Sequence, residues 1–251
     1  MDNGIDEKLL IARAEDTVML CERQYVVKFM GFLSPAESAI ISYNMPAGDV
    51  KSFFFGGYPE AERKLFVALP EYAEETDAEE LIAVLEITGR EIDALTHRDF
   101  LGSLLGLGIR REKIGDILVY EDKTVVFVLE DIADYIILNL QKVGRCGIKI
   151  RRMSAEEIEI PKRRVELINA TVASMRLDCI AAAALRLSRS KVLDILAEGR
   201  VSLNWIECKN PSAVVRTGDT LSIRGVGRFR MCEEVRETKK GRLAVGIEKM
   251  L

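Results

Sequence analysis

The residues of this chain best suited to chemistry are the arginines and serines between positions 176 and 191. Arg176 stands two residues before Asp178, and the basic segment Arg186-Leu-Ser-Arg-Ser-Lys191 follows. A guanidinium is a planar fork that binds phosphate oxygens bidentately and stacks on exposed bases. No nucleophile, base and orienting group stand together as covalent catalysis requires. The pattern therefore predicts binding of folded RNA.

The elements that must position these residues are two short helices and a small sheet. Apolar residues at helical spacing predict a helix from residue 177 and a second helix that Ser188 caps and Gly199 ends. Alternating apolar residues predict short strands from residue 201 and around residues 221–223. The candidate RNA-binding residues at the junctions of these elements are Arg176, Asp178, Arg186, Ser188, Arg189, Ser190, Lys191, Arg200, Asn204 and Arg216.

The charge of the chain is divided unequally along its length. Residues 162–251 carry 18 Lys and Arg against 10 Asp and Glu, a net charge of +8. Residues 1–161 carry 18 against 30, a net charge of −12, so the overall charge of −4 hides the asymmetry. A basic module on an acidic chain indicates a nucleic-acid contact surface at one end.

The bulk composition is that of a globular protein. The 251 residues allow two or three small domains, and 48% hydrophobic with 30% charged residues is ordinary for such a chain. No apolar run reaches the roughly 18–20 residues that cross a membrane, and the acidic start lacks a signal-peptide pattern. The five cysteines are far apart and form no C-x-x-C pair, so we expect no metal site. These features predict a cytoplasmic protein without membrane insertion.

The remaining chain predicts an α+β protein in three parts. Residues 1–48 are predicted to form a helical hairpin, in which Ser34 caps the second helix. Residues 49–160 alternate strands with two helices, which predicts a split β-α-β sheet like that of an RNA-recognition motif (RRM). A charged connector over 154–164 leads to the C-terminal domain, residues 165–251.

The stretch from residue 175 to residue 225 resembles the RNA-binding domain named after small-subunit ribosomal protein S-four. It carries the Arg-Leu-Asp opening at 176, the Ser-Arg-Ser start of the second helix at 188, the G-x-V-x-x-N strand and the final Gly-Asp turn. Trp205 departs from the family, because many members have glycine there. The resemblance implies a small α/β-hairpin fold and an RNA-binding role.

A second segment extends the resemblance to the whole chain. Residues 95–116, Leu-Thr-His-Arg-Asp-Phe-Leu-Gly-Ser-Leu-Leu-Gly-Leu-Gly-Ile-Arg-Arg-Glu-Lys-Ile-Gly-Asp, resemble the central signature of the bacterial YlmH family. That family has an RRM-like domain before the S-four-type domain, and its genes often lie beside cell-division genes. Related small proteins bind the large ribosomal subunit while it holds peptidyl-tRNA. The resemblance implies ribosome-associated quality control or rescue of stalled translation.

The same central segment supplies a second set of candidates. His97, the only histidine, could contact RNA or act as an acid or base, or it could simply start a helix. The glycines of the segment do not stand between a strand and a helix, which excludes a Rossmann nucleotide loop. The secondary RNA contacts predicted here are His97, Arg98, Arg110, Arg111 and Lys113.

These inferences predict a non-catalytic, monomeric RNA-binding protein without a cofactor. Its expected partners are the rRNA of the large ribosomal subunit and tRNA. An RNA-modifying enzyme of the pseudouridine synthase or methyltransferase type is one alternative, because such enzymes also carry an S-four-type domain. A cell-division accessory protein that acts through protein contacts is the other alternative.

Overall fold

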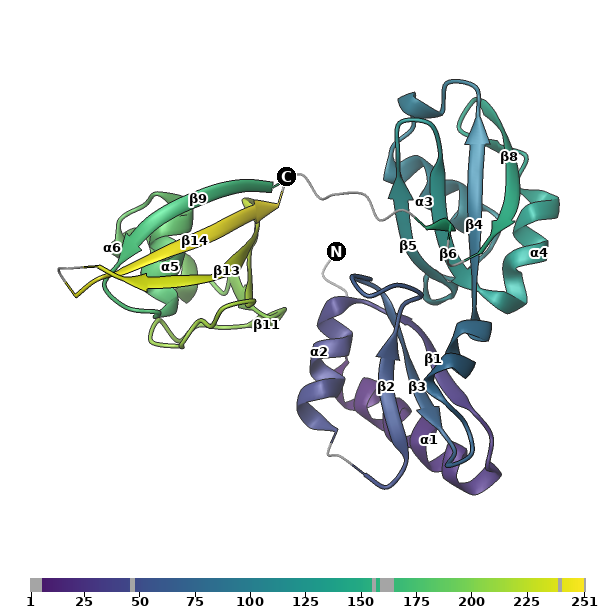
Figure 1. Ribbon diagram of the computed structural model, residues 1–251, viewed down its shortest axis with the longest axis horizontal. Helices are drawn as coiled ribbons and strands as arrows, with labels where there is room; N and C mark the ends of the chain where they lie inside the picture. The colour runs from purple at the N-terminus through teal and green to yellow at the C-terminus, as the bar shows by residue number, and fades with distance from the viewer. Residues whose placement is uncertain (1–5, 46–47, 155–156, 159–164, 239–240, 251) are drawn as a thin grey trace. The chain divides into compact units, whose positions relative to one another are not determined.

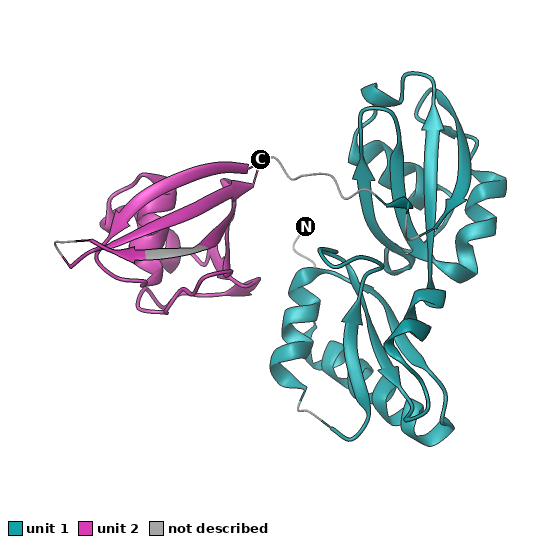
Figure 2. Ribbon diagram, viewed as in Figure 1, with its two compact units in different colours: residues 1–161 teal, residues 162–251 magenta. Residues whose placement is uncertain are grey.

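The chain folds into two compact units, residues 1–161 and residues 162–251 (Figure 2). The computed structural model describes all residues except 1–5, 46–47, 155–156, 159–164, 239–240 and 251, and at 233–235 it describes the backbone alone. The connector predicted over 154–164 therefore lies largely outside the described residues. The boundary between the units coincides with the change in charge along the sequence.

The first unit begins with a three-stranded sheet and two helices (Figure 1). Its sheet has the order β1-β3-β2 and is antiparallel. The elements are α1 (Glu7–Gln24), β1 (Lys28–Leu33), α2 (Pro35–Asn44), β2 (Lys51–Phe55) and β3 (Lys64–Leu69). The capping box predicted for α2 is present, since the Ser34 and Glu37 side chains each bond the other's backbone N–H.

The prediction of an all-helical segment over residues 1–48 was wrong. A strand, β1, separates the two helices and pairs with β3 from beyond the expected domain boundary. Its sequence, Lys-Phe-Met-Gly-Phe-Leu, is too short to distinguish a strand from a helix by period alone. The strands β2 and β3 belong to this sheet, not to the RRM-like one.

The rest of the first unit is the RRM-like part, with the element order β4-α3-β5-β6-α4-β7-β8. Its sheet has the order β5-β6-β4-β8-β7 with antiparallel neighbours, and α3 and α4 share a core with one face of it. The strands are β4 (Ile82–Gly89), β5 (Ile114–Val119), β6 (Thr124–Leu129), β7 (Lys142–Val143) and β8 (Cys146–Met153). The helices are α3 (His97–Gly106) and α4 (Glu130–Asn139), with 3-10 turns at Glu75–Leu81, Ile92–Ala94 and Arg111–Lys113.

Part of the other face of the RRM-like sheet packs against the N-terminal sheet. Phe32 from β1 and Val67 from β3 pack in one core with Val125 and Phe127 from β6. Gly115 makes this approach possible, because a Cβ there would lie 2.7 Å from the Phe32 ring. The two sheets of the first unit are thus joined through a shared apolar layer.

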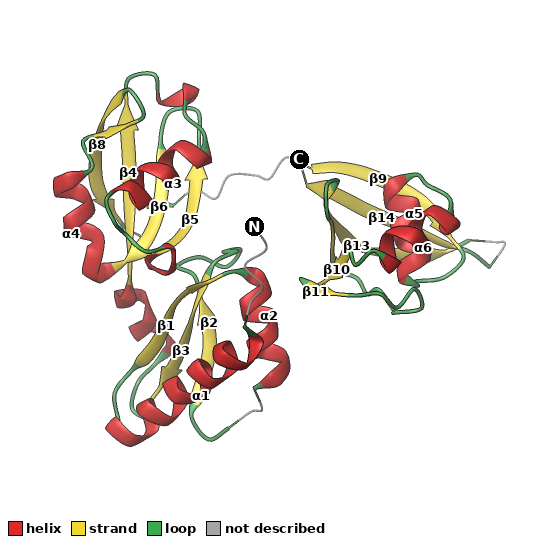
Figure 3. Cartoon of the chain, turned by 180° about the vertical axis from the view of Figure 1, so that it is seen from behind, coloured by secondary structure: helices red, strands yellow, loops and turns green. Residues whose placement is uncertain are grey.

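The second unit is a six-stranded antiparallel sheet with two helices against one face (Figure 3). The strand order is β11-β10-β12-β13-β14-β9. The helices are α5 (Leu177–Leu185) and α6 (Arg189–Ala197). The strands are β9 (Val165–Val172), β10 (Val201–Leu203), β11 (Ile206–Glu207), β12 (Thr220–Ile223), β13 (Gly227–Glu237) and β14 (Leu243–Met250). The predicted helices and first strands are present, but the sheet is larger than expected because β9, β13 and β14 enlarge it.

Candidate nucleic-acid interface

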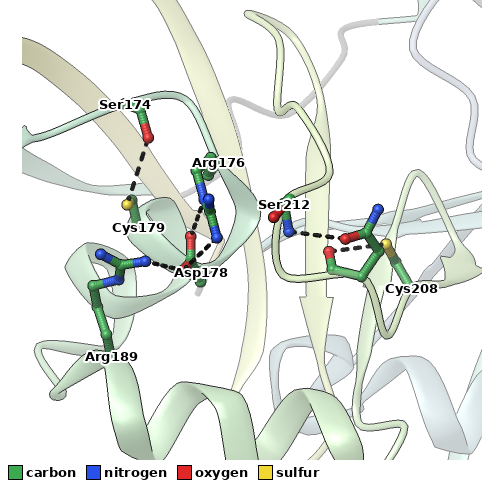
Figure 4. A network of polar contacts seen from close by, with 8 residues as sticks. Ser174, Arg176, Asp178, Cys179, Arg189, Cys208 and Ser212 are labelled. Atoms are coloured by element: carbon green, nitrogen blue, oxygen red, sulfur yellow. Dashed lines mark hydrogen bonds and ion pairs between the residues drawn. The ribbon is translucent and has the colours of Figure 1, made fainter.

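A buried carboxylate organises the first predicted arginines of the second unit. Asp178, in the first turn of α5, is only 1% exposed. Its Oδ1 accepts a hydrogen bond from Arg176 Nε at 3.1 Å, and its Oδ2 accepts from Arg189 of α6 (Figure 4). Burial alone would raise the pKa of Asp178, but the hydrogen bonds from Arg189 and Arg176 outweigh it and the pKa is lowered. The carboxylate therefore stays ionised and fixes both guanidiniums.

The two arginines keep donors for a further ligand. The side chain of Arg176 is 42% exposed, and that of Arg189 is 56% exposed. A guanidinium has five N–H donors, and Asp178 takes up at most two from each. Asp178 itself cannot reach RNA from its buried position, so its predicted direct contact is corrected to the positioning of Arg176 and Arg189.

The start of α6 adds a second feature that favours an anion. Ser188 is the N-cap, and its Oγ accepts from Lys191 N at 3.5 Å and lies 3.0 Å from Ser190 Oγ. The first turn holds no acidic residue and carries Arg189 and Lys191 instead. Cations at the positive end of a helix dipole cost stability unless an anion lies close to them. Asp178 is such an anion for Arg189, and a phosphate at the helix start would be one for Lys191. The arrangement therefore points to a phosphate-binding helix start.

Arg186 lies between the two helices in a left-handed conformation, with φ of 54°. Its side chain is 75% exposed and its Nη2 lies 3.6 Å from Glu166 Oε1 on β9. An ion pair this open contributes little to stability. Arg186 is thus free to turn toward a ligand at the junction of α5 and α6.

The other three candidates have separate surroundings. Asn204 Nδ2 donates to Asp219 Oδ1 at 2.9 Å, and Asn204 Oδ1 accepts from Thr220 N at 3.0 Å. Arg216 N donates to Asp219 Oδ2 at 2.7 Å. Asn204 therefore ties two turns together while it stays exposed, and its RNA contact remains a prediction. Arg200 bonds Glu198 Oε2 at 3.2 Å and the Arg224 carbonyl at 3.0 Å, so its known partners differ from those of Arg176 and Arg189.

The first unit uses its predicted arginine for structure. Arg111 is half-buried and donates to the carbonyls of Ile114 and Gly115. Its pKa is lowered to about 10, first by burial and then by the positive charge of Arg63, while Asp116 opposes the shift. The predicted phosphate contact of Arg111 is therefore replaced by a role in holding the start of β5.

Sequence reasoning missed the partners of Arg111. Arg63 donates to the carbonyls of Phe32 at 2.6 Å and Ile114 at 3.0 Å, which joins the two sheets. Asp116 accepts from Tyr58 Oη at 2.7 Å and from Arg63 N at 3.0 Å. The turn sequence Gly-Gly-Tyr-Pro at residues 56–59 was the available signal, since it ends β2 and brings the next residues back toward the RRM-like sheet.

The other predicted contacts of the first unit lie at the surface. His97 is the first residue of α3, and its pKa is lowered first by desolvation and then by the charge of Arg111. Arg98 is exposed. Arg110 pairs with Glu112 at 3.0 Å, and Lys113 Nζ pairs with Asp131 Oδ2 at 2.5 Å. These ion pairs give no specific indication of a phosphate site.

The RRM-like sheet does not offer an open aromatic face for bases. Phe127 on the central strand β6 is fully buried against the N-terminal sheet. Beyond that core, Glu86 is 9% exposed and is paired with Arg151 at 2.7 Å and with Lys123 at 3.5 Å. Part of the surface on which RNA-recognition motifs stack bases is therefore occupied here by the chain itself.

The part of the chain that the structure describes has neither a candidate metal cluster nor a candidate membrane-spanning helix. Within it, no three His, Cys, Asp or Glu residues gather as a metal site would require. None of its helices is both long and apolar enough to cross a bilayer.

Comparison with known proteins identifies the family. Residues 77–157 match the family model described as "Putative RNA-binding domain in YlmH". The chain is 35% identical over 246 residues to the ribosome-associated protein quality control protein P2 of Bacillus subtilis, with 97% of this chain and 95% of that protein covered. The chain belongs to the YlmH family.

A solved structure of a YlmH protein supports the fold. The cell division protein YlmH from Streptococcus pneumoniae superposes with a TM-score of 0.52 at 21% identity, over 63% of this chain and 98% of that one. At this identity the likeness bears on architecture alone. The mixed α+β fold and the YlmH resemblance predicted from sequence are both confirmed.

Proposed function

We propose that this YlmH-family chain binds RNA on the ribosome through the helical face of its second unit and acts in quality control of stalled translation. The observation that carries the proposal is the pair Arg176 and Arg189, fixed by buried Asp178 beside the basic start of α6. The net charge of +8 over residues 162–251 supports the same face. The expected partners are the rRNA of the large subunit and tRNA, in keeping with the name of the Bacillus subtilis relative.

The mechanism we propose is binding without covalent chemistry. The two fixed guanidiniums would set the register on the RNA backbone, and the exposed Arg186 and Lys191 would add phosphate contacts. The N–H groups at the start of α6 would donate hydrogen bonds to a phosphate. Such an interface recognises the shape of folded RNA more than its sequence.

The test is sedimentation through a sucrose gradient, with crosslinking and sequencing of attached RNA. We expect the tagged protein to migrate with free large subunits that carry tRNA. Replacing Arg176, Arg186 and Arg189 with alanine should weaken RNA binding at least tenfold at moderate salt and shift the protein to the top of the gradient. The matched control replaces three exposed cations of the first unit, Arg13, Lys51 and Arg145, and should remain on the subunit.

Two outcomes would contradict this proposal. One is unchanged affinity of the triple variant with a native circular-dichroism spectrum. The other is an affinity that does not depend on salt, because phosphate contacts release counterions. Migration of the wild type at the top of the gradient without rRNA crosslinks would favour a protein partner in its place, as the cell-division alternative requires.

A further inference from the structure

A separate cavity lies on the sheet of the second unit, on the face away from the helices. Val201, Leu221 and Phe229 point into the core with α5 and α6. Their strand neighbours Ser202, Ser222 and Arg228 therefore point to the opposite face, because side chains alternate along a strand. These three line a cavity of about 490 Å³. Its size is that of a small-molecule site.

The walls of this cavity are cationic and aromatic. Its lining includes Trp205, Arg200, Arg224, Arg228, Ser222 and Glu207. The single carboxylate, Glu207, is paired with Lys209 at 3.3 Å, outside the lining. The hydroxyl of Ser222 is buried and has no hydrogen-bond partner among the described residues. Unsatisfied buried polar groups are rare and favour a ligand that completes them.

Trp205 occupies a backbone position that disfavours it. Leu203 pairs with Ile206, which leaves Asn204 and Trp205 as a two-residue hairpin loop with φ of 49° and 65°. Two positive φ values are the mark of a type I′ turn, for which Asn-Gly is the preferred sequence. A bulky side chain in this conformation is strained, and strain of this kind is retained where the side chain has a use.

We propose that this cavity binds an unpaired nucleotide of RNA, with its base stacked on Trp205 and its phosphate held by Arg224 and Arg200. Stacking on an aromatic ring tolerates any base, since every base has a π face. Arg224 is exposed, and Arg200 is fixed beside Gly225 by its bond to the Arg224 carbonyl. The site rests on the proposed RNA-binding function and adds single-stranded RNA to its ligands on a second face of the same unit.

The chain carries its own reporter for this site. Trp205 is its only tryptophan, so the emission of the full-length protein reports one position. A single-stranded oligouridine RNA should quench this emission in a saturable manner. A perfectly paired RNA duplex of equal length, which has no unpaired base to insert, should bind without quenching. Fluorescence anisotropy of the labelled RNAs measures binding independently of the tryptophan.

The variants separate stacking from folding. Trp205→Gly removes the ring and relieves the turn, so we expect an unchanged or higher Tm together with about tenfold weaker binding of oligouridine. Trp205→Phe should retain part of the affinity. Arg224→Ala should also weaken binding of the single strand. Arg230→Ala is the matched control, because Arg230 lies on the same face of β13 outside the cavity.

The outcomes divide clearly between the two proposals. Binding of oligouridine without quenching, or equal affinity of Trp205→Gly and the wild type, overturns the nucleotide site and leaves the helical RNA-binding face intact. If the wild-type protein bound neither the single-stranded RNA nor the duplex, both the nucleotide site and the proposed RNA-binding function would be overturned. Quenching by the duplex equal to that by the single strand would place ordinary duplex contact at Trp205 and would also overturn the nucleotide site.

Discussion

The arginines of the two units are used in opposite ways. In the first unit Arg63 and Arg111 are half-buried and donate to backbone carbonyls at the junction of two sheets. In the second unit Arg176 and Arg189 donate to a buried carboxylate and keep about half of their side-chain surface exposed. The pKa of Arg111 is lowered because its charge is desolvated, whereas the pKa of Asp178 is lowered because its charge is favoured by two partners. The difference shows that an arginine indicates a ligand site only when its fixing partner leaves its donors exposed.

The largest expected effect comes from removing Arg63. Arg63→Ala removes the side-chain donor of the Phe32 carbonyl and one of the two side-chain donors of the Ile114 carbonyl, which Arg111 also bonds. We expect the free energy of unfolding of the first unit to fall by about 3 kcal/mol, because hydrogen bonds to a charged group are lost and polar atoms are left buried. Urea unfolding followed by circular dichroism measures this loss.

The same variant tests whether Arg63 has a structural role alone and makes no contact with RNA. The RNA affinity of folded Arg63→Ala protein should equal that of the wild type. A large loss of affinity without a loss of stability would mean that this arginine faces RNA, and the comparison between the units would fail.

A smaller effect is expected at Asp178. Asp178→Asn removes the charge that holds Arg176 and Arg189, and should lower the stability of the second unit by about 2 kcal/mol at neutral pH. RNA affinity should fall several-fold, because the guanidiniums lose their fixed orientation. Urea unfolding measures the change in stability, and titration with labelled RNA on the same protein preparations measures the change in affinity.

The pH dependence of stability tests whether Asp178 acts as a stabilising carboxylate. The folded pKa of Asp178 lies below its ordinary value of 3.8, so its contribution to stability is complete well above that value. That contribution is lost as the pH falls from the unfolded pKa through the lower folded pKa. In Asp178→Asn the free energy of unfolding should therefore fall less steeply with decreasing pH than in the wild type. An equally steep fall in both proteins would show that the Asp178 carboxylate does not stabilise the fold as an anion.

The smallest effect is expected from Lys113 in the first unit. Its side chain pairs with Asp131, whose side chain is 60% exposed. Lys113→Ala should change the stability by no more than about 0.5 kcal/mol and leave RNA affinity unaltered. A tenfold loss of affinity would restore this residue as the phosphate contact that the sequence predicted.

Local signals in the sequence predicted α2, α3 and α6 well, because each of these helices begins with a recognisable cap. Ser34, Thr96 and Ser188 are all N-cap residues in the structure. The left-handed turn at residues 204 and 205 also followed from Asn204. What failed was long-range: β1 pairs with β3 across about 35 residues, and nothing in the local period of Lys28–Leu33 announces that partner.

In the candidate site, too, residue types could be predicted from the sequence, whereas burial and long-range partners could not. The arginines could be found by type and spacing, but the burial of Asp178 depends on how α5 and α6 pack, which spacing does not reveal. Arg111 could not be distinguished from Arg110 in sequence, yet one is half-buried and the other is 73% exposed. Arg63 and Asp116 act together from positions 53 residues apart.

The pairing of β9 with β14 has a consequence for how the protein is made. Val165 pairs with Met250, so the strand that opens the second unit must wait for the strand that completes its sheet. Val245 and Ile247 of β14 also fill the core beneath α5 and α6. Until residue 250 has left the translating ribosome, the helices lack the support that sets Asp178 and its arginines. The orientation of Arg176 and Arg189 is therefore fixed only after β9 and β14 have both been synthesised and paired.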